Sequence, residues 1–166
     1  MPVKSVQDLL LNELRDLYDV EKQLVKALPK VAKAASSEQL RQAIGEHLEE
    51  TKAQVQRLED AFARLGTPAR GKRCEAMHGL IDEASQMMEE IKTPQVLDAA
   101  LIAGAQKVEH YEIAAYGSAR ALAEASGHPQ VAQLLDETLE EEKAADEKLN
   151  QIALSEVNQA ALEAAA

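Results

Sequence analysis

Three glutamates lie at positions where the pattern of a core-facing helix requires an apolar residue. Glu21, Glu112 and Glu142 each interrupt a stripe of mainly apolar residues that recur every three or four positions, which is the spacing of one helix face. The stripes are Leu10, Leu14, Leu17, Glu21, Leu24, Leu28 and Val31; Leu101, Ala105, Val108, Glu112, Ala115, Ala119 and Leu122; and Val131, Leu135, Thr138, Glu142, Ala145, Leu149 and Ile152. A carboxylate on a buried face is strongly destabilising unless its charge is compensated. A divalent metal shared by several such glutamates inside a helical bundle provides that compensation.

A fourth stripe carries polar residues near its middle. It reads Leu40, Ile44, His47, Thr51, Gln54, Leu58, Ala61 and Leu65. Glu50 lies beside His47 and Gln54 on this side of the helix and is the candidate carboxylate of the segment. Each of four expected helices therefore has a polar interruption near its middle.

The four glutamates are spaced as two matching pairs. Glu50 follows Glu21 by 29 residues, and Glu142 follows Glu112 by 30. A turn midway between the members of a pair would place them side by side in an antiparallel hairpin. Two divalent ions balance the four negative charges, and oxygen ligands suit iron, or alternatively manganese. We therefore predict a site for two metal ions whose ligands are Glu21, Glu50, Glu112 and Glu142.

Six further residues lie about one helical turn from the predicted ligands and can share their faces. They are Glu109, Gln54, Asp146, His47, Tyr18 and Tyr116. The first four can add or replace a ligand, and the two tyrosines can hydrogen-bond to the carboxylates. His47 is equally well interpreted as a polar core residue, and Glu109 as a ligand or as a partner of one.

The elements that must position these side chains are all helices. Ala, Leu, Glu, Lys and Gln dominate the chain, and we find no strand-like alternation. We expect one domain, 1–166, with helices over about 5–35, 38–65, 75–91, 94–125 and 129–152. The tail, 153–166, is either a further helical piece or frayed. Two helical hairpins joined by a long crossover that contains a short helix predict a ferritin-like four-helix bundle.

Composition excludes several classes of function. The formal net charge of the 166-residue chain is −11 and its basic residues are scattered, which argues against nucleic-acid and anionic membrane surfaces as partners. Cys74 is the only cysteine, so no intramolecular disulfide can form. We see neither a secretory signal nor an apolar run long enough to span a membrane, and expect a cytoplasmic protein.

Four short motifs occur in an order that resembles the bacterial YciE/YciF family of the ferritin-like superfamily. They are Asp16–Leu24, His47–Thr51, Lys107–Ile113 and Leu139–Lys143, and the resemblance covers roughly residues 4–155. It implies a bundle similar to rubrerythrin, a dinuclear metal site, a homodimer and a link to bacterial stress responses. The resemblance does not imply a particular reaction.

The sequence departs from better-known di-iron relatives, which carry Glu-x-x-His on two helices. Ala53 and Ala145 stand where those histidines are expected. Gln54, Asp146 or His47 are the candidates to replace them. Because the nitrogen ligands would be fewer, the chemistry of those relatives does not simply transfer.

Three functions are compatible with such a site. A di-metal oxidoreductase would act on dioxygen, peroxide or ferrous iron, with a small oxidant or metal ion as its substrate. Alternatively, the metal only stabilises the bundle of a non-catalytic structural or binding protein that serves the stress response. An iron-storage subunit is the third, and it requires a cage of many copies. Whether the protein is an enzyme stays open at this point.

Overall fold

The computed structural model describes residues 3–164, and these are almost entirely helical. The elements are α1 (Val6–Ala34), α2 (Glu38–Arg64), α3 (Glu75–Glu90), α4 (Pro94–Ala125), α5 (Pro129–Ile152), a π-helical stretch (Ala153–Val157) and α6 (Asn158–Ala164). No strand occurs in this range, so the all-α class is confirmed. The main helices end within one residue of the expected positions, and the tail continues as helix to Ala164. Residues 165–166 of the expected tail lie outside the described part.

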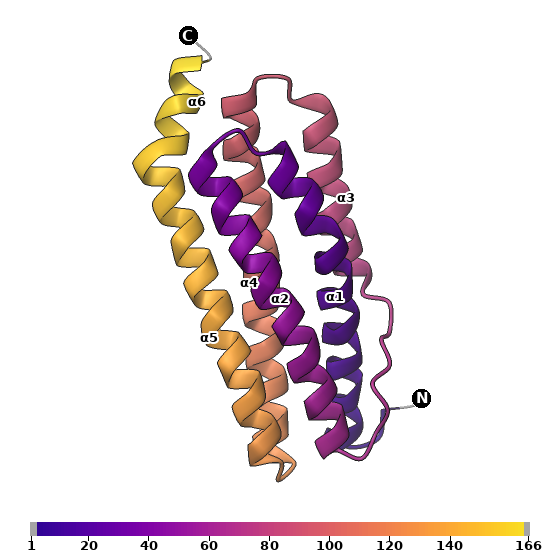
Figure 1. Ribbon diagram of the computed structural model, residues 1–166. Coiled ribbons are helices and arrows are strands. Elements are labelled where there is room, and N and C mark those ends of the chain that lie inside the picture. Colours follow the sequence, from indigo (N-terminus) through magenta and orange to yellow (C-terminus); the bar gives the residue numbers. More distant parts are fainter. Residues whose placement is uncertain (1–2, 165–166) are drawn as a thin grey trace.

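The four long helices form two antiparallel hairpins (Figure 1). A short turn joins α1 to α2, and a tight turn joins α4 to α5 at Gly127. Gly127 has φ +80°, a left-handed conformation that a residue with a Cβ rarely adopts and that commonly ends helices. The chain between the hairpins, including α3, runs back along the length of the bundle, so α2 and α4 point the same way. This is the ferritin-like topology predicted from the two hairpins and the long crossover.

A layer of buried polar side chains divides the apolar core into two clusters. One cluster surrounds the α1–α2 turn and includes Leu28, Leu40, Ile44, Leu101 and Leu149. The other lies toward the α4–α5 turn and includes Leu14, Leu58, Phe62, Ala119 and Leu135. The buried polar residues between the clusters are Glu21, His47, Thr51, Gln54, Glu109, Glu112, Thr138 and Glu142. Apolar burial above and below thus stabilises the bundle and offsets the cost of this layer.

Asp98, near the start of α4, fastens the α1–α2 turn to the rest of the bundle. Its carboxylate accepts hydrogen bonds from the Ser36 N–H at 2.7 Å, the Ser37 N–H at 2.9 Å and the Ser36 hydroxyl at 2.5 Å. The side chain is buried, so these bonds are shielded from water. Asp98 therefore holds the two hairpins together at the end of the bundle where the chain turns.

We expect Asp98→Ala to lower the free energy of unfolding by roughly 2–4 kcal/mol, because several charge-assisted hydrogen bonds are lost together. Urea denaturation followed by circular dichroism measures the effect. Asp60→Ala is the matched control at an exposed position of α2, and it should change stability by less than about 0.5 kcal/mol. Equal effects of the two substitutions would show that the hydrogen bonds of Asp98 do not stabilise the α1–α2 turn.

The crossover is fixed to α1 and α4 by polar contacts at the start of α3. The Cys74 N–H donates to Asp19 Oδ2 at 2.9 Å, and Tyr111 on α4 donates its hydroxyl proton to Asp16 Oδ2 at 2.6 Å. The Cys74 thiol lies 3.1 Å from the Tyr111 hydroxyl oxygen. Burial raises the pKa of the Cys74 thiol above its ordinary value, so the thiol stays protonated and unreactive.

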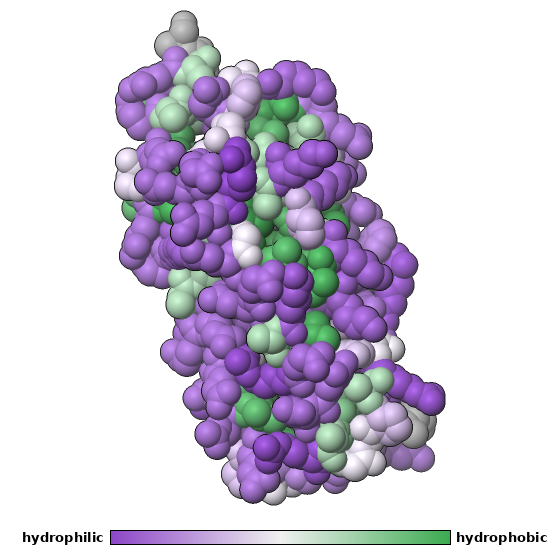
Figure 2. Space-filling view, viewed as in Figure 1, coloured by the Kyte–Doolittle hydropathy of each residue, from purple (hydrophilic) through white to green (hydrophobic). Residues whose placement is uncertain are grey.

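The outside of the bundle is mainly polar. Figure 2 shows a largely hydrophilic face, on which apolar side chains emerge in a narrow band along the bundle. None of the helices in residues 3–164 combines the length and the apolar character that a membrane crossing needs.

Candidate metal centre

Five ionisable side chains from all four long helices meet in the polar layer. Glu21 comes from α1, His47 from α2, Glu109 and Glu112 from α4, and Glu142 from α5. One nitrogen or oxygen atom from each of the last four residues lies within 4.8 Å of the others. Glu21 lies near enough for its charge to raise the pKa of Glu112. The two hairpins therefore contribute side chains to one buried cluster.

Neighbouring side chains orient several members of the cluster. The Tyr116 hydroxyl donates a hydrogen bond to Glu21 Oε1, and the Gln54 amide donates one to Glu142 Oε1 at 2.5 Å. His47 Nε2 lies 3.4 Å from Glu109 Oε1 and 3.9 Å from Glu142 Oε2. Tyr116 and Gln54 thus perform the orienting role that hydrogen-bond partners of metal ligands commonly have.

Glu21, Glu109 and Glu112 are destabilised as anions. Burial, together with the charge of Glu142, raises the pKa of Glu21 and Glu112 well above their ordinary value, although the Tyr116 hydrogen bond partly opposes this at Glu21. Burial and the neighbouring Glu142 carboxyl also raise the pKa of Glu109. Among the described residues no lysine or arginine forms an ion pair with any member of the cluster. Among the described residues, His47 is therefore the only basic side chain beside these carboxylates.

Many polar atoms of the cluster have no hydrogen-bond partner in the described part of the chain. They include both carboxylate oxygens of Glu112, one oxygen each of Glu21, Glu109 and Glu142, and both ring nitrogens of His47. Buried polar atoms without partners are rare in folded proteins and need an explanation such as an ion. Carboxylate oxygens with an imidazole nitrogen are a donor set that iron and manganese accept. The buried histidine and glutamates thus form a group that could hold a metal ion, and the residues fit the predicted cofactor.

Three of the four predicted ligands lie in the cluster, and the fourth does not. Glu21, Glu112 and Glu142 are fully buried. The Glu50 side chain is 50% exposed, and its Oε2 lies 3.5 Å from His47 Nδ1, on the side of the ring away from Glu109. The face of α2 that turns inward carries His47, Thr51 and Gln54, which leaves Glu50 at the edge.

Of the six auxiliary residues predicted from the sequence, four lie at the cluster and two form other contacts. Glu109, His47, Gln54 and Tyr116 belong to the cluster or touch it. Tyr18 donates its hydroxyl proton to Glu59 at 2.8 Å, at a distance from the glutamate cluster. Asp146 accepts from Gln106 and contacts His110, each at 3.1 Å, and its charge helps to raise the pKa of Glu109.

Arg57 is a residue that the sequence pattern did not single out. Its guanidinium group donates two hydrogen bonds of 2.8 Å to Glu141 and one of 2.7 Å to Thr138. Glu141 also accepts a hydrogen bond from Gln54 at 3.0 Å. Partial burial disfavours the Glu141 anion, yet the Arg57 hydrogen bonds hold the pKa of Glu141 below its ordinary value. Arg57 therefore fixes the position of Gln54 through Glu141.

Two helical hairpins with a buried layer of glutamates define an all-α protein of the ferritin-like kind. The chain belongs to the family described as a domain of unknown function, DUF892, whose sequence model matches residues 5–162. The protein YciF of Escherichia coli (strain K12) is 48% identical over 162 residues, which are 97% of this chain and 98% of that protein. The expected YciE/YciF-type relationship is thereby confirmed.

Solved structures support the same relationship. The structure described as the E. coli stress protein YciF has a TM-score of 0.90 at 48% identity and covers 94% of this chain and 99% of its own. YcfI of Rhodopseudomonas palustris, for which a structural role has been suggested, has a TM-score of 0.89 at 48% identity. The match covers 91% of this chain and 96% of YcfI. A Xanthomonas campestris protein with a TM-score of 0.76 at 21% identity shares the fold.

Proposed function

We propose that this protein binds two divalent metal ions, iron or alternatively manganese, in its buried polar layer and serves a bacterial stress response. The ligands in this proposal are Glu21, Glu109, Glu112 and Glu142, with His47 as the nitrogen donor. Bound there, the ions would supply redox chemistry toward dioxygen, peroxide or ferrous iron. The stress-protein description of the E. coli relative supports the setting.

One observation carries the proposal: among the described residues, four buried glutamates converge without a lysine or arginine partner and leave five carboxylate oxygens without a hydrogen bond. An ordinary buried salt bridge would pair each carboxylate with a lysine or arginine. Two divalent ions would balance the four charges and give the oxygens partners. The donor set is rich in oxygen, which favours iron or manganese over softer metals.

The chain's own residues would prepare the site for this role. Tyr116 holds one oxygen of Glu21 and Gln54 holds one oxygen of Glu142, so the second oxygen of each is free to bind. The apolar clusters shield the layer from water on the two sides that they cover. This shielding strengthens the interaction between the carboxylates and a cation.

A non-catalytic role is the alternative, and the suggested structural role of the R. palustris relative favours it. In that case the ions only join the two hairpins, and metal removal would lower the melting temperature with no loss of any turnover. Peroxide consumption by the metal-loaded protein distinguishes the two roles. Turnover supports the oxidoreductase, and a large melting shift without turnover supports the structural protein.

Elemental analysis of protein purified without chelators or nickel affinity columns tests the proposal directly. We expect about two iron or manganese ions per chain, as in di-metal carboxylate bundles. If no metal is bound, even after anaerobic loading with Fe²⁺ or Mn²⁺, the glutamates are structural and the proposal fails.

Two tyrosines make a matched pair for a finer test. Tyr116→Phe removes the hydrogen bond to Glu21, and we expect metal affinity to fall about 10–100-fold. Tyr18→Phe removes a hydroxyl of the same kind that bonds to Glu59 instead, and it should leave affinity unchanged. Calorimetric titration with Mn²⁺ measures both variants. Equal affinities would show that Tyr116 does not position a metal ligand.

A further inference from the structure

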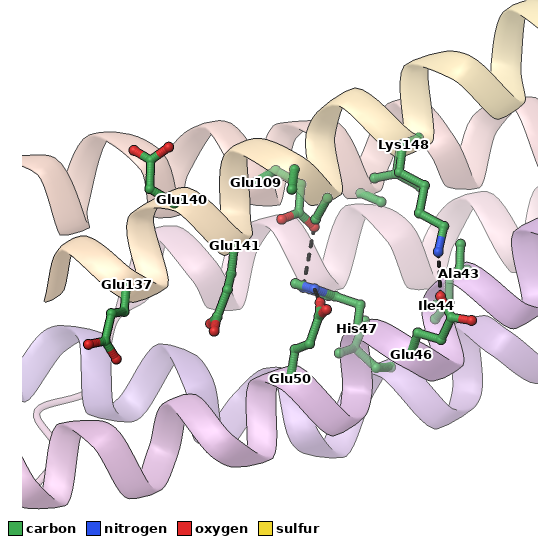
Figure 3. A pocket seen from close by; sticks show the side chains of 15 residues that line it. Ala43, Ile44, Glu46, His47, Glu50, Glu109, Glu137, Glu140, Glu141 and Lys148 are labelled. Carbon is green, nitrogen blue, oxygen red and sulfur yellow. Dashed lines mark hydrogen bonds and ion pairs between the residues drawn. The ribbon is translucent and has the colours of Figure 1, made fainter. Parts of the chain in front are cut away.

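A cavity of about 380 Å³ lies between α2 and α5 and leads from the surface to the glutamate cluster (Figure 3). His47 and Glu109 form part of its wall at the buried end. Glu50 and Glu141 extend into the space between the two helices from opposite sides. Small side chains such as Ala145 keep it open. The cavity is therefore a route by which a small solute can reach the cluster.

The buried end of this cavity carries a polar side chain without a hydrogen-bond partner. The His47 side chain is only 9% exposed, and neither of its ring nitrogens forms a hydrogen bond with any residue that the structure describes. Nδ1 lies 3.5 Å from Glu50, and Nε2 lies 3.4 Å from Glu109. The imidazole ring thus connects the carboxylate at the mouth with the carboxylates of the interior.

The mouth is acidic, and most of its charge is already neutralised. Arg57 pairs with Glu137 and Glu141, and Lys148 pairs with Glu46. Among the residues described, Glu50 has no lysine or arginine partner. One carboxylate at the mouth therefore remains free to bind a cation.

We propose that the α2–α5 cavity admits divalent metal cations to the cluster, and that Glu50 and His47 form the first position at which such an ion binds. The inference rests on the proposed function, because the ion must have a buried site to reach. From this position Glu109 and Glu142 lie on the opposite side of the His47 ring, 3.4 Å and 3.9 Å from Nε2.

Physical chemistry favours a cation at this position. The carboxylates at the mouth outnumber the lysine and arginine side chains that pair with them, so the mouth has a net negative charge. A field of this sign concentrates cations and raises their association rates, by about 10–10³-fold in strongly charged clefts. A carboxylate oxygen together with an imidazole nitrogen suits first-row divalent ions. The exposed Glu50 side chain also changes rotamer within nanoseconds, which is fast compared with the binding of a dilute ion. Anions are repelled by the same charges.

The rate of Co²⁺ uptake by metal-free protein tests the inference, because bound Co²⁺ has a visible absorption band that stopped-flow mixing can follow. For Glu50→Gln we expect uptake to be about tenfold slower, with the same number of ions bound at equilibrium. Glu49→Gln is the matched control, since Glu49 is an exposed neighbour of Glu50 that pairs with Lys52 and does not line the cavity. It should take up Co²⁺ at the wild-type rate.

A second variant blocks the route without removing a charge. Ala145→Leu adds bulk to the cavity wall, and it should slow uptake with unchanged binding at equilibrium. Wild-type rates in both Glu50→Gln and Ala145→Leu would overturn the inference and leave the proposed function intact. Loss of a bound ion at equilibrium in Glu50→Gln would also overturn it, because Glu50 would then be a resident ligand. If the wild-type protein binds no Co²⁺, the proposed function fails as well.

Discussion

Glu112→Gln is expected to abolish tight metal binding and to make the metal-free protein more stable. Both oxygens of Glu112 are buried and have no hydrogen-bond partner among the described residues, so the substitution removes a ligand and a buried acid at once. The loss of affinity should exceed the roughly 10–100-fold that follows removal of a ligand's hydrogen-bond partner. The gain in metal-free stability should be about 1–4 kcal/mol at neutral pH. Elemental analysis and urea denaturation measure the two effects.

The control for this experiment is Glu140→Gln, which alters an exposed carboxylate on α5. Glu141, beside it, is unsuitable because it bonds to Arg57 and Gln54. We expect Glu140→Gln to change neither metal content nor stability beyond about 0.5 kcal/mol. If Glu112→Gln kept its metal, Glu112 would not be a metal ligand. If it destabilised the metal-free protein, the buried Glu112 carboxyl group would not be unfavourable.

Metal-free protein should lose stability as the pH rises from 5 to 8. Burial raises the pKa of Glu21, Glu109 and Glu112 in the folded state, whereas unfolded glutamates ionise near pH 4.5. Between pH 4.5 and the raised pKa values, these glutamates hold protons in the folded state that they have already released in the unfolded state. Stability from these groups is therefore complete below about pH 4.5 and is lost as pH rises through the folded pKa. Each group contributes up to about 1.4 kcal/mol per pH unit.

Bound metal should remove this dependence, because ions stabilise the ionised carboxylates. Urea midpoints measured from pH 5 to 8, with chelator and with excess Mn²⁺, give the two profiles. The chelated protein should weaken with rising pH and the Mn²⁺-loaded protein should not. Chelated Glu112→Gln should show a shallower decline, since it has one buried acid fewer. A chelated profile that rises with pH would refute the assignment of raised pKa values.

Helical periodicity and turn residues were sufficient to predict most of the fold. The helix breaks at Gly66 and at Ser126–Pro129 separate long amphipathic segments, and the segment lengths favour two hairpins joined by a long crossover. The same periodicity placed Glu21, Glu112 and Glu142 inside the bundle, where the structure also has them. Local spacing carries this information because each helix face is set by residues three and four apart.

Which residue of an adjacent pair turns inward is harder to predict. The matched spacing of the two hairpins favoured Glu50, but the buried face of α2 passes through His47, Thr51 and Gln54. On α4 it passes through Glu109 instead of Val108, which is only partly buried. A helix has 3.6 residues per turn, so one residue rotates a side chain by about 100°. The exact inward face then depends on the packing of neighbouring helices.

Asp98 and Arg57 escaped prediction for another reason. Their partners, Ser36 and Glu141, are distant in sequence, and nothing in the local pattern marks them as pairs. Arg57 does follow Gln54 by three residues, so its position on the same side of α2 was available as a hint. Such contacts become visible only when the helices are assembled.

Cys74 gives the unmodified protein a built-in probe of its own local motions. Its thiol is buried against Tyr111 at the first turn of α3, so a labelling reagent can reach it only after this part of the crossover lifts away. It is the only cysteine in the chain, so the rate of alkylation reports a single event. Compared with an unprotected thiol, that rate gives the free energy of local opening. Measured with and without Mn²⁺, this free energy would show whether metal binding in the polar layer also makes local opening at the start of α3 less favourable.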